Sequence, residues 1–357
     1  MLAFSCKRRH FCPSCHAKRV AAFGEFACSN VLKNVPHRHF VFSIPKIIRI
    51  YFLFDRNLLK ELARIAWEVP GLYYKNAVSK ENIIPAAISS IQTFGDFLGF
   101  NPHLHILCAD GCFKDTGMFY TSPVDINSGS LEPLFRHKVL LMLKKKGLIT
   151  EQTIKLILSW RHTGFNVYCT DRIYTRFTQS MENLARYIIR ASFSQERMNY
   201  ISEQSKVIYK SKNGNNTKEF DATDFIANIC SHIPNKNEQM IRYTGYYSNT
   251  SRGRRKKQGA CESDFVIEDD NNKGANKSWA RLIKKIYEVD PLICPKCGGQ
   301  MRIIALLEDY KIVKKILDYL GIYEFERDRP PPRALSVADS FDDYAQDDYI
   351  NTDYTDF

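Results

Sequence analysis

The feature that most constrains this chain is a pair of histidines, His103 and His105, on either side of a single leucine. They lie in the run Asn-Pro-His-Leu-His-Ile-Leu at residues 101–107, whose apolar residues predict a buried strand. Side chains at i and i+2 of a strand point to the same face, so the two imidazoles stand side by side. Such a pair suits a divalent metal if a third ligand arrives from elsewhere. Taken alone, it is better explained as two structural histidines.

A second pair, His37 and His39, has the same spacing in an alternating run that is stopped by Pro45. It is a rival metal pair. Arg38 stands between these two histidines, and an arginine does not pack in a core as Leu104 does. We therefore rank this pair below the first.

Length and charge bound the class of protein. The 357 residues are enough for two or three domains, and the net charge is +12. The tail from Glu326 onward contains nine acidic residues and three arginines, so the remainder has 48 Lys and Arg against 30 Asp and Glu. A body this basic suggests a polyanionic partner, most simply nucleic acid.

Neither a membrane span nor an export signal is predicted. No apolar run reaches the roughly 18 residues that cross a bilayer. The start, Met-Leu-Ala-Phe-Ser-Cys-Lys-Arg-Arg, is too short and too quickly charged for a signal peptide. We expect a cytoplasmic protein with no membrane partner.

Five of the eleven cysteines lie in two tight sets, Cys6, Cys12 and Cys15 near the start and Cys294 and Cys297 near the end. In a reducing compartment, closely spaced cysteines indicate a metal more often than a disulfide. Both Cys-Pro-x-Cys segments are typical of zinc knuckles, in which a turn directs two thiolates at one tetrahedral ion. We expect structural Zn²⁺ at each.

The first zinc element is short of ligands. Cys6 can add a third thiolate, and His10 or His16 can contribute a further ligand. A complete site normally pairs two knuckles, and the chain begins before a second one fits. We expect an element that needs other ligands or that has lost its first half.

Periodicity and turn residues outline the remaining elements. Asp110-Gly111 predicts a two-residue hairpin after the histidine strand, and Gln92 lies in a further segment, read as helical, over residues 84–100. The helix at 178–190 has a core stripe with Tyr187 at its edge, where a hydroxyl can reach a cleft. Helices are also expected at 17–34, 55–68, 131–146, 150–160, near 225–229, 279–289 and 308–320, a strand at 165–169 and a polar hairpin at 206–220.

Aromatic residues followed by a basic run indicate a nucleic-acid surface, because rings stack on bases and cations bind phosphates. A solvated loop explains the basic run alone equally well. The residues of this segment are Arg242, Tyr243, Arg252, Arg254, Arg255, Lys256 and Lys257.

Five motifs occur in a fixed order and together resemble one family. They are Cys-Pro-Ser-Cys at 12–15, Asn-Pro-His-Leu-His at 101–105 followed by Asp-Gly, Leu-Ala-Arg-Tyr at 184–187, Arg-Tyr-x-Gly at 242–245, and Asp-Pro-Leu-x-Cys-Pro-x-Cys-Gly at 290–298. This order is similar to that of the rolling-circle transposases of bacterial insertion sequences with an N-terminal zinc-binding domain. These are members of the His-hydrophobe-His (HUH) endonuclease group. The resemblance covers about residues 4–322.

The resemblance implies an α+β fold, with a central antiparallel sheet, helices on one face, and small flanking zinc-knuckle elements. It implies that His103 and His105 bind Mg²⁺ or Mn²⁺, with Gln92 as third ligand. The expected domains are a partial zinc-binding element at 1–34, an HUH-type catalytic domain at 35–205, a basic DNA-binding segment and linker at 206–277, a C-terminal knuckle and helix at 278–322, and a disordered acidic tail at 323–357.

The resemblance also implies that Tyr187 is a nucleophile that cuts one DNA strand and forms a covalent phosphotyrosine. A phosphotyrosine keeps the energy of the phosphodiester, so a 3′-hydroxyl can later reverse the step without ATP. Two-tyrosine members of the group place their nucleophiles four residues apart on this helix, but here that position holds Asn183. We expect a single-tyrosine variant. The reserve candidates are Tyr168, Tyr174 and Tyr200.

The resemblance implies another cysteine pair ahead of Cys6. This chain has none there, so we expect that its N-terminus is truncated. Three functions stay open. They are a transposase that nicks and rejoins single-stranded DNA, an inert zinc-ribbon nucleic-acid-binding protein, and a hydrolase in which the histidines activate water and Tyr187 only packs. The sequence gives no indication of oligomeric state.

Overall fold

The structure is a computed structural model that describes residues 10–123, 126, 128–174, 178–258, 292–294, 297–301, 310–319 and 321. The chain divides into two compact units, Met1–Asp290 and Pro291–Phe357, and each is described by itself. In the described part of the chain, no helix is both long and apolar enough to cross a membrane.

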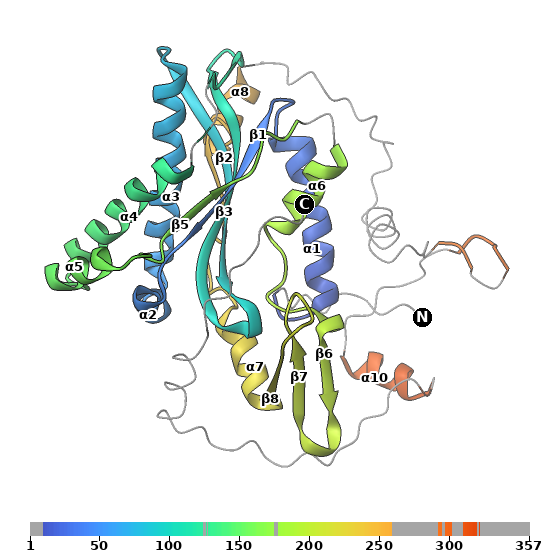
Figure 1. Ribbon diagram of the computed structural model, residues 1–357. Coiled ribbons are helices and arrows are strands. Elements are labelled where there is room, and N and C mark those ends of the chain that lie inside the picture. Colours follow the sequence, from blue (N-terminus) through green and yellow to red (C-terminus); the bar gives the residue numbers. More distant parts are fainter. Residues whose placement is uncertain are drawn as a thin grey trace. The chain divides into compact units, whose positions relative to one another are not determined.

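The first unit is built on an antiparallel sheet with the strand order β5-β1-β3-β2-β9, in which β4 also pairs with β3 (Figure 1). The histidine strand β3 lies between β1 and β2, so its backbone is hydrogen-bonded on both sides. The antiparallel α+β class is therefore confirmed. The strands are β1 His37–Ser43, β2 Ile83–Phe94, β3 Phe100–Lys114, β4 Phe119–Thr121, β5 Asn166–Cys169 and β9 Ile241–Gly245.

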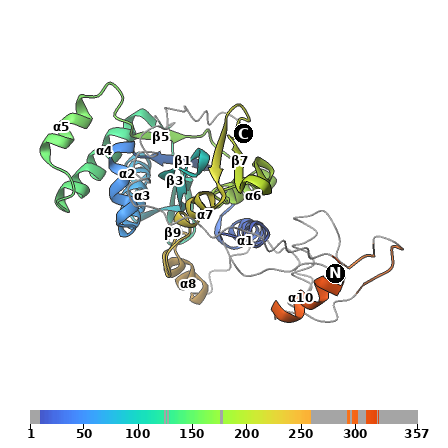
Figure 2. The same ribbon diagram turned by 90° about the horizontal axis from the view of Figure 1, so that it is seen from below.

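One face of the sheet packs against α2, α3 and α4 (Figures 1 and 2). Alternate residues of the strands, such as Phe40, Leu104 and Ile106, are buried there against Leu62 and Phe135. The expected helix at 55–68 is present but extends further, to Val78. The helices are α2 Lys46–Phe54, α3 Asn57–Val78, α4 Ser128–Lys145 and α5 Glu151–Ser159.

The opposite face carries His103 and His105 and is covered by α1 Pro13–Phe26, the short helix Ala27–Val31 and α6 Thr178–Tyr187. In Figure 2 these helices lie on the other side of the sheet from α3 and α4. Helices were expected on one face of the sheet, but they cover both faces. Strands β2 and β3 are apolar at both odd and even positions, and a strand of that kind needs a cover on each face.

A small three-stranded sheet follows α6, with the order β6-β7-β8 and α7 beside it (Figure 1). Tyr209, Phe220 and Phe225 form its separate core. The polar hairpin expected at 206–220 is confirmed as β7 and β8. The elements are β6 Met198–Ile201, β7 Lys206–Lys210, β8 Thr217–Asp221 and α7 Ala222–Ser231, with short 3₁₀ turns at Asp96–Leu98, Gln195–Arg197 and Ser202–Gln204.

The hairpin expected at Asp110-Gly111 is wrong. Strand β3 continues through both residues to Lys114, and the chain reverses beyond it. The Asp110 side chain is fully buried and forms ion pairs with Arg38, at 3.2 Å, and with Arg172. The aspartate therefore ties strands together instead of marking a solvated turn.

In the second unit, the described residues include α10 Tyr310–Tyr319, which matches the helix expected at 308–320. Gly298 has a φ of 69°, and its amide donates to the Cys294 carbonyl at 2.8 Å. The helix expected at 279–289 and the acidic tail lie outside the described residues.

Candidate functional site

The sheet brings His103, His105 and Gln92 together on the face that α6 covers. Gln92 of β2 stands directly opposite His103 of β3 in the antiparallel register, and Ser90 stands opposite His105. The rings of the two histidines have their centroids 5.0 Å apart. Gln92 was expected on a helix, and that expectation is wrong because the segment 84–94 forms the strand next to the histidines.

Hydrogen bonds decide which histidine nitrogens remain available. The Nδ1 of His103 donates to the Asn101 carbonyl at 2.8 Å, which leaves Nε2 as the acceptor. The Nδ1 of His105 lies 2.9 Å from Nε2 of His39, and Nε2 of His105 is buried with no hydrogen-bond partner among the described residues. Each ring can thus present Nε2 to a ligand while a neighbour holds its other nitrogen.

Burial keeps these histidines neutral. It lowers the pKa of His103 to about 4, against an ordinary value of 6.5. It also lowers the pKa of His105 well below its ordinary value, and the neighbouring His103 and His39 add to that effect. Neutral imidazole is the form that binds metals, so both rings are competent ligands at pH 7.

Gln92 makes two kinds of contact at once. Its Nε2 donates to the Ile188 carbonyl at 3.0 Å and to the Tyr187 carbonyl at 3.4 Å. Its Oε1 is buried and has no hydrogen-bond partner among the described residues. The side chain therefore fixes the end of α6 while leaving an acceptor oxygen free.

Tyr187 ends helix α6 and is half-buried. Its ring meets His105 edge-on, with centroids 5.4 Å apart and an interplanar angle of 86°, and it meets His39 in the same way at 6.5 Å. The helix is held beneath by α1, on which Ala185 and Ile188 pack through Phe23 and its neighbours. Asn183, one turn earlier, is exposed.

Arg38 is buried, so the expectation that an arginine does not pack in the core between His37 and His39 is wrong. That arginine is 5% exposed and packs inside the fold because Asp110 compensates its charge at 3.2 Å. His37 and His39 have different partners. His39 contacts His105, whereas Nε2 of His37 lies 2.8 Å from the Tyr247 hydroxyl. Only the strand pairing of β1 with β3 identifies His39 as a neighbour of the site.

The side chains present fit a divalent cation. Nε2 of His103, Nε2 of His105 and Oε1 of Gln92 are acceptors, and the last two are buried without partners in the described structure. Among the described residues, no group of three His, Cys, Asp or Glu side chains could hold a metal. The candidate set therefore depends on the amide oxygen, a ligand that suits hard cations such as Mg²⁺ or Mn²⁺.

The first cysteine pair lies at a helix start and not in an isolated turn. Cys12 is the N-cap of α1 and Cys15 is buried one turn on, while Cys6 lies outside the described residues. A helix N-terminus favours thiolates, the form that binds zinc. His16 donates from Nε2 to the Ile189 carbonyl at 2.8 Å, and the ring of His10 contacts Arg19.

The second cysteine pair, Cys294 and Cys297, belongs to the second unit. The Gly298 amide donates to the Cys294 carbonyl at 2.8 Å, and the Cys294 amide donates to the Gly299 carbonyl at 2.9 Å. Backbone amides close to the cysteines in this way are typical of zinc knuckles.

The basic segment folds into β9 and α8 Asn249–Lys257. Arg254, Lys256 and Lys257 are exposed, while Arg252 stacks over the ring of Tyr243 at 5.3 Å. Burial lowers the pKa of the partly buried Arg242. The three exposed cations and the ring–cation stack form a surface able to bind a polyanion.

Arg255 does not belong to that surface. It is buried, its guanidinium lies 3.6 Å from the centre of the Tyr246 ring, and it donates to the Tyr246 carbonyl at 3.0 Å. Its guanidinium faces the protein because one side of every helical turn packs against the fold, so its position gives no support to the expectation that it binds DNA.

Comparisons with known proteins match this chain to transposases. Residues 86–255 match the family described as "Putative transposase", and residues 1–44 match the family described as "Transposase zinc-binding domain". A "Transposase for insertion sequence element IS801" from Pseudomonas savastanoi pv. phaseolicola is 20% identical over 327 residues, which cover 82% of this chain and 75% of that protein. No solved structure matches the chain.

The two family matches support a transposase, a protein that acts on DNA. Over these ranges the chain is similar to insertion-sequence transposases and to their zinc-binding domain.

Proposed function

We propose that this transposase nicks and rejoins single-stranded DNA through a covalent bond between Tyr187 and a 5′-phosphate. The observation that carries the proposal is the position of Tyr187, whose ring lies edge-on to His105 at 5.4 Å. The ring also meets His39, burial keeps both of these histidines neutral, and Gln92 holds the Tyr187 carbonyl.

The proposed step is a displacement at phosphorus. The phenol of Tyr187 loses its proton, its oxygen forms a bond to the scissile phosphorus, and the bond to the 3′-oxygen breaks. The 3′-oxygen leaves with a proton as a hydroxyl group, and the reverse reaction joins strands. Residues Gln92, His103 and His105 would hold Mg²⁺ or Mn²⁺, which when bound polarises the phosphate and orients it toward the nucleophile.

Gln92 contributes to alignment as well. Because its Nε2 holds the carbonyls of Tyr187 and Ile188, the strand that carries the acceptor oxygen also fixes the end of the nucleophile helix. Pre-organisation of this kind removes the entropy cost of bringing nucleophile and phosphate together. The exposed cations of α8 would bind the flanking strand, and zinc at Cys12, Cys15 and Cys6 and at Cys294 and Cys297 would stabilise the terminal elements.

The test is covalent capture of the DNA. The full chain is incubated with single-stranded DNA that contains the end of its element and with Mn²⁺, and adducts that resist boiling in detergent are measured. Wild-type protein should form the adduct, Tyr187→Phe should abolish it, and EDTA should prevent it.

Tyr200→Phe is the matched control, because Tyr200 is exposed on β6, a strand of the separate three-stranded sheet. It should form the adduct as the wild type does. An adduct that persists in Tyr187→Phe would show that another residue is the nucleophile. Free 5′-phosphate ends without any adduct would indicate a hydrolase, and binding without cleavage at any metal would indicate an inert DNA-binding protein.

A further inference from the structure

We propose that Arg190 is a catalytic residue that binds the scissile phosphate between the metal ligands and Tyr187. This inference rests on the proposed function and names the residue that would hold the substrate's charge.

Arg190 lies beside Tyr187, the candidate nucleophile, because the chain makes another turn after the end of α6. The Arg190 amide donates to the Tyr187 carbonyl at 3.1 Å, so the chain makes one further turn after the tyrosine. The guanidinium carbon then lies 4.7 Å from the centre of the Tyr187 ring and 5.6 Å from that of Phe94. Two aromatic rings thus hold the guanidinium in place.

Among the described residues, Arg190 has no counter-ion. In the described part of the chain, Arg186 pairs with Glu182 and Arg197 pairs with Asp96, whereas no carboxylate pairs with Arg190. Its Nε is also buried without a hydrogen-bond partner among the described residues. A partly buried cation in this state favours binding of an anion.

The geometry places that anion next to the histidines. The ring of Tyr187 lies 5.4 Å from that of His105, and the guanidinium of Arg190 lies 4.7 Å from the centre of the same tyrosine ring. A cation held by those histidines would repel Arg190 unless an anion lay between them, and a phosphodiester provides that anion.

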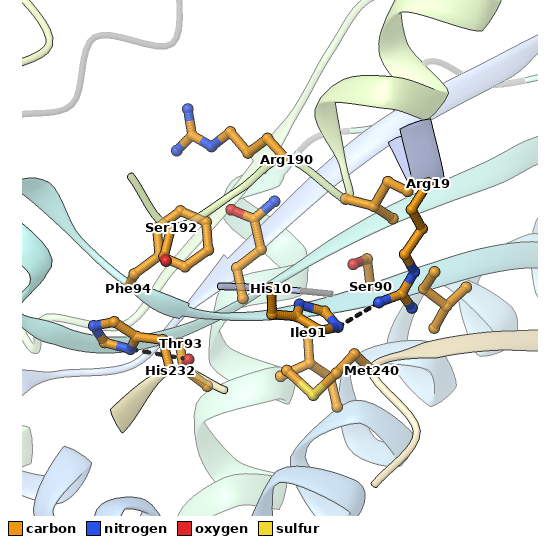
Figure 3. Close-up of a pocket in the computed structure, with 13 residues that line it drawn as sticks. His10, Arg19, Ser90, Ile91, Thr93, Phe94, Arg190, Ser192, His232 and Met240 are labelled. Atoms are coloured by element: carbon orange, nitrogen blue, oxygen red, sulfur yellow. Dashed lines mark hydrogen bonds between the residues drawn. The ribbon is translucent and has the colours of Figure 1, made fainter. Parts of the chain in front are cut away.

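A pocket borders Arg190 at the edge of the sheet. It lies where β9 stops pairing with β2, and its lining includes Arg190, Gln92 and Ser90 from the site, with Arg19, Thr93 and Ser192 around them (Figure 3). Arg19 comes from α1 and Arg190 from the segment after α6, so two elements each contribute a cation. The rest of the lining is mostly apolar, and these guanidinium and hydroxyl groups are the ones that can hydrogen-bond to a nucleic-acid backbone.

In the reaction proposed above, the phosphate keeps its negative charge while charge also builds on the attacking and leaving oxygens. A guanidinium that donates to the non-bridging oxygens stabilises this transition state more than the ground state. Lysine would supply the charge but not the planar fork that binds two oxygens.

The experiment compares two DNA strands that differ only at the cleaved position. One has the ordinary phosphodiester and the other a single methylphosphonate, which is neutral. On the phosphodiester, Arg190→Ala should slow adduct formation about 100-fold and Arg190→Lys should slow it less. On the methylphosphonate, Arg190→Ala should slow adduct formation only about three-fold, because the cleaved position carries no negative charge for Arg190 to compensate.

Arg197→Ala is the matched control, since Arg197 also stacks on a tyrosine but is paired with Asp96. It should form the adduct at the wild-type rate on both strands. If Arg190→Ala forms the adduct as fast as the wild type, or loses the same factor on both strands, the inference is overturned. Arg190→Lys and Arg190→Gln repeat the comparison if the alanine variant does not fold. A wild type that forms no adduct would overturn the proposed function itself.

Discussion

At the scale of single residues, Gln92 connects two parts of the site that the chain separates by about ninety positions. Its Oε1 is a free acceptor beside His103, and its Nε2 holds the carbonyls at the end of α6. The two ends of one amide group thus serve ligand binding and nucleophile placement separately. That separation can be tested by substitutions that keep one function and remove the other.

Gln92→Glu should keep Mn²⁺ binding but lower the rate of adduct formation by about 10-fold or more. The carboxylate retains a ligand oxygen, but its second oxygen faces the Ile188 carbonyl, where a donor is needed. Gln92→Leu removes both functions and should weaken Mn²⁺ binding as well. Titration calorimetry with Mn²⁺ measures the first effect, and single-turnover adduct formation measures the second. Equal rates for Gln92→Glu and wild type would contradict the positioning role.

At the scale of elements, the central strand β3 is held at its far end by a buried charge cluster. Asp110 pairs with Arg38 of β1 and with Arg172, which follows β5 and also donates to the Ser122 carbonyl at 3.2 Å. The cluster therefore joins neighbouring strands where apolar packing gives way to loops. Breaking such a buried pair leaves an uncompensated charge, which costs more than the loss of an exposed pair.

Asp110→Asn should lower the free energy of unfolding by about 3–5 kcal/mol, because Arg38 would remain buried without a counter-charge. Urea unfolding followed by circular dichroism measures the change. The control is Glu61→Gln, which removes a partly exposed pair with Arg64 on α3 and should cost about 0.5 kcal/mol or less. Similar losses for both variants would show that the cluster contributes little.

At the scale of the whole molecule, burial of several histidines makes stability depend on pH. Burial lowers the pKa of His37 and of His232 from 6.5 to about 4. His37 is held by the Tyr247 hydroxyl, while His232 is held by the Leu98 carbonyl and Thr93. In the unfolded chain each would bind a proton near pH 6.5, whereas in the folded protein each stays neutral to about pH 4. Acid therefore favours the unfolded state across this window.

The stability present above pH 6.5 should be lost progressively as the pH falls toward 4. Each of these histidines contributes a loss of about 1.4 kcal/mol per pH unit within that range. Urea midpoints at pH 7, 6 and 5 test the prediction. His232→Phe should show a shallower pH dependence, because the phenyl ring has no proton to bind. A flat profile between pH 6.5 and 5 in the wild type would contradict it.

Local patterns were enough for most elements. The apolar run around Leu104 predicted the central strand, the stripe of Met181, Leu184 and Ala185 predicted α6, and both follow from period and burial alone. Asp110-Gly111 misled, because the same dipeptide forms either a solvated turn or a buried continuation. Two arginines that are distant in sequence decided between them.

What the sequence by itself determined was the set of chemical groups and the two periodicities that place them. His103 and His105 share a face because a strand repeats every two residues, and Tyr187 lies at the edge of its helix because a helix repeats every 3.6. Which groups meet was decided only by the tertiary structure. The register of β1, β2 and β3 brought His39 and Gln92 to the histidines, and the end of α6 placed Arg190 over Tyr187. Strand register and helix docking depend on contacts between residues far apart in the chain, and no local pattern encodes those contacts.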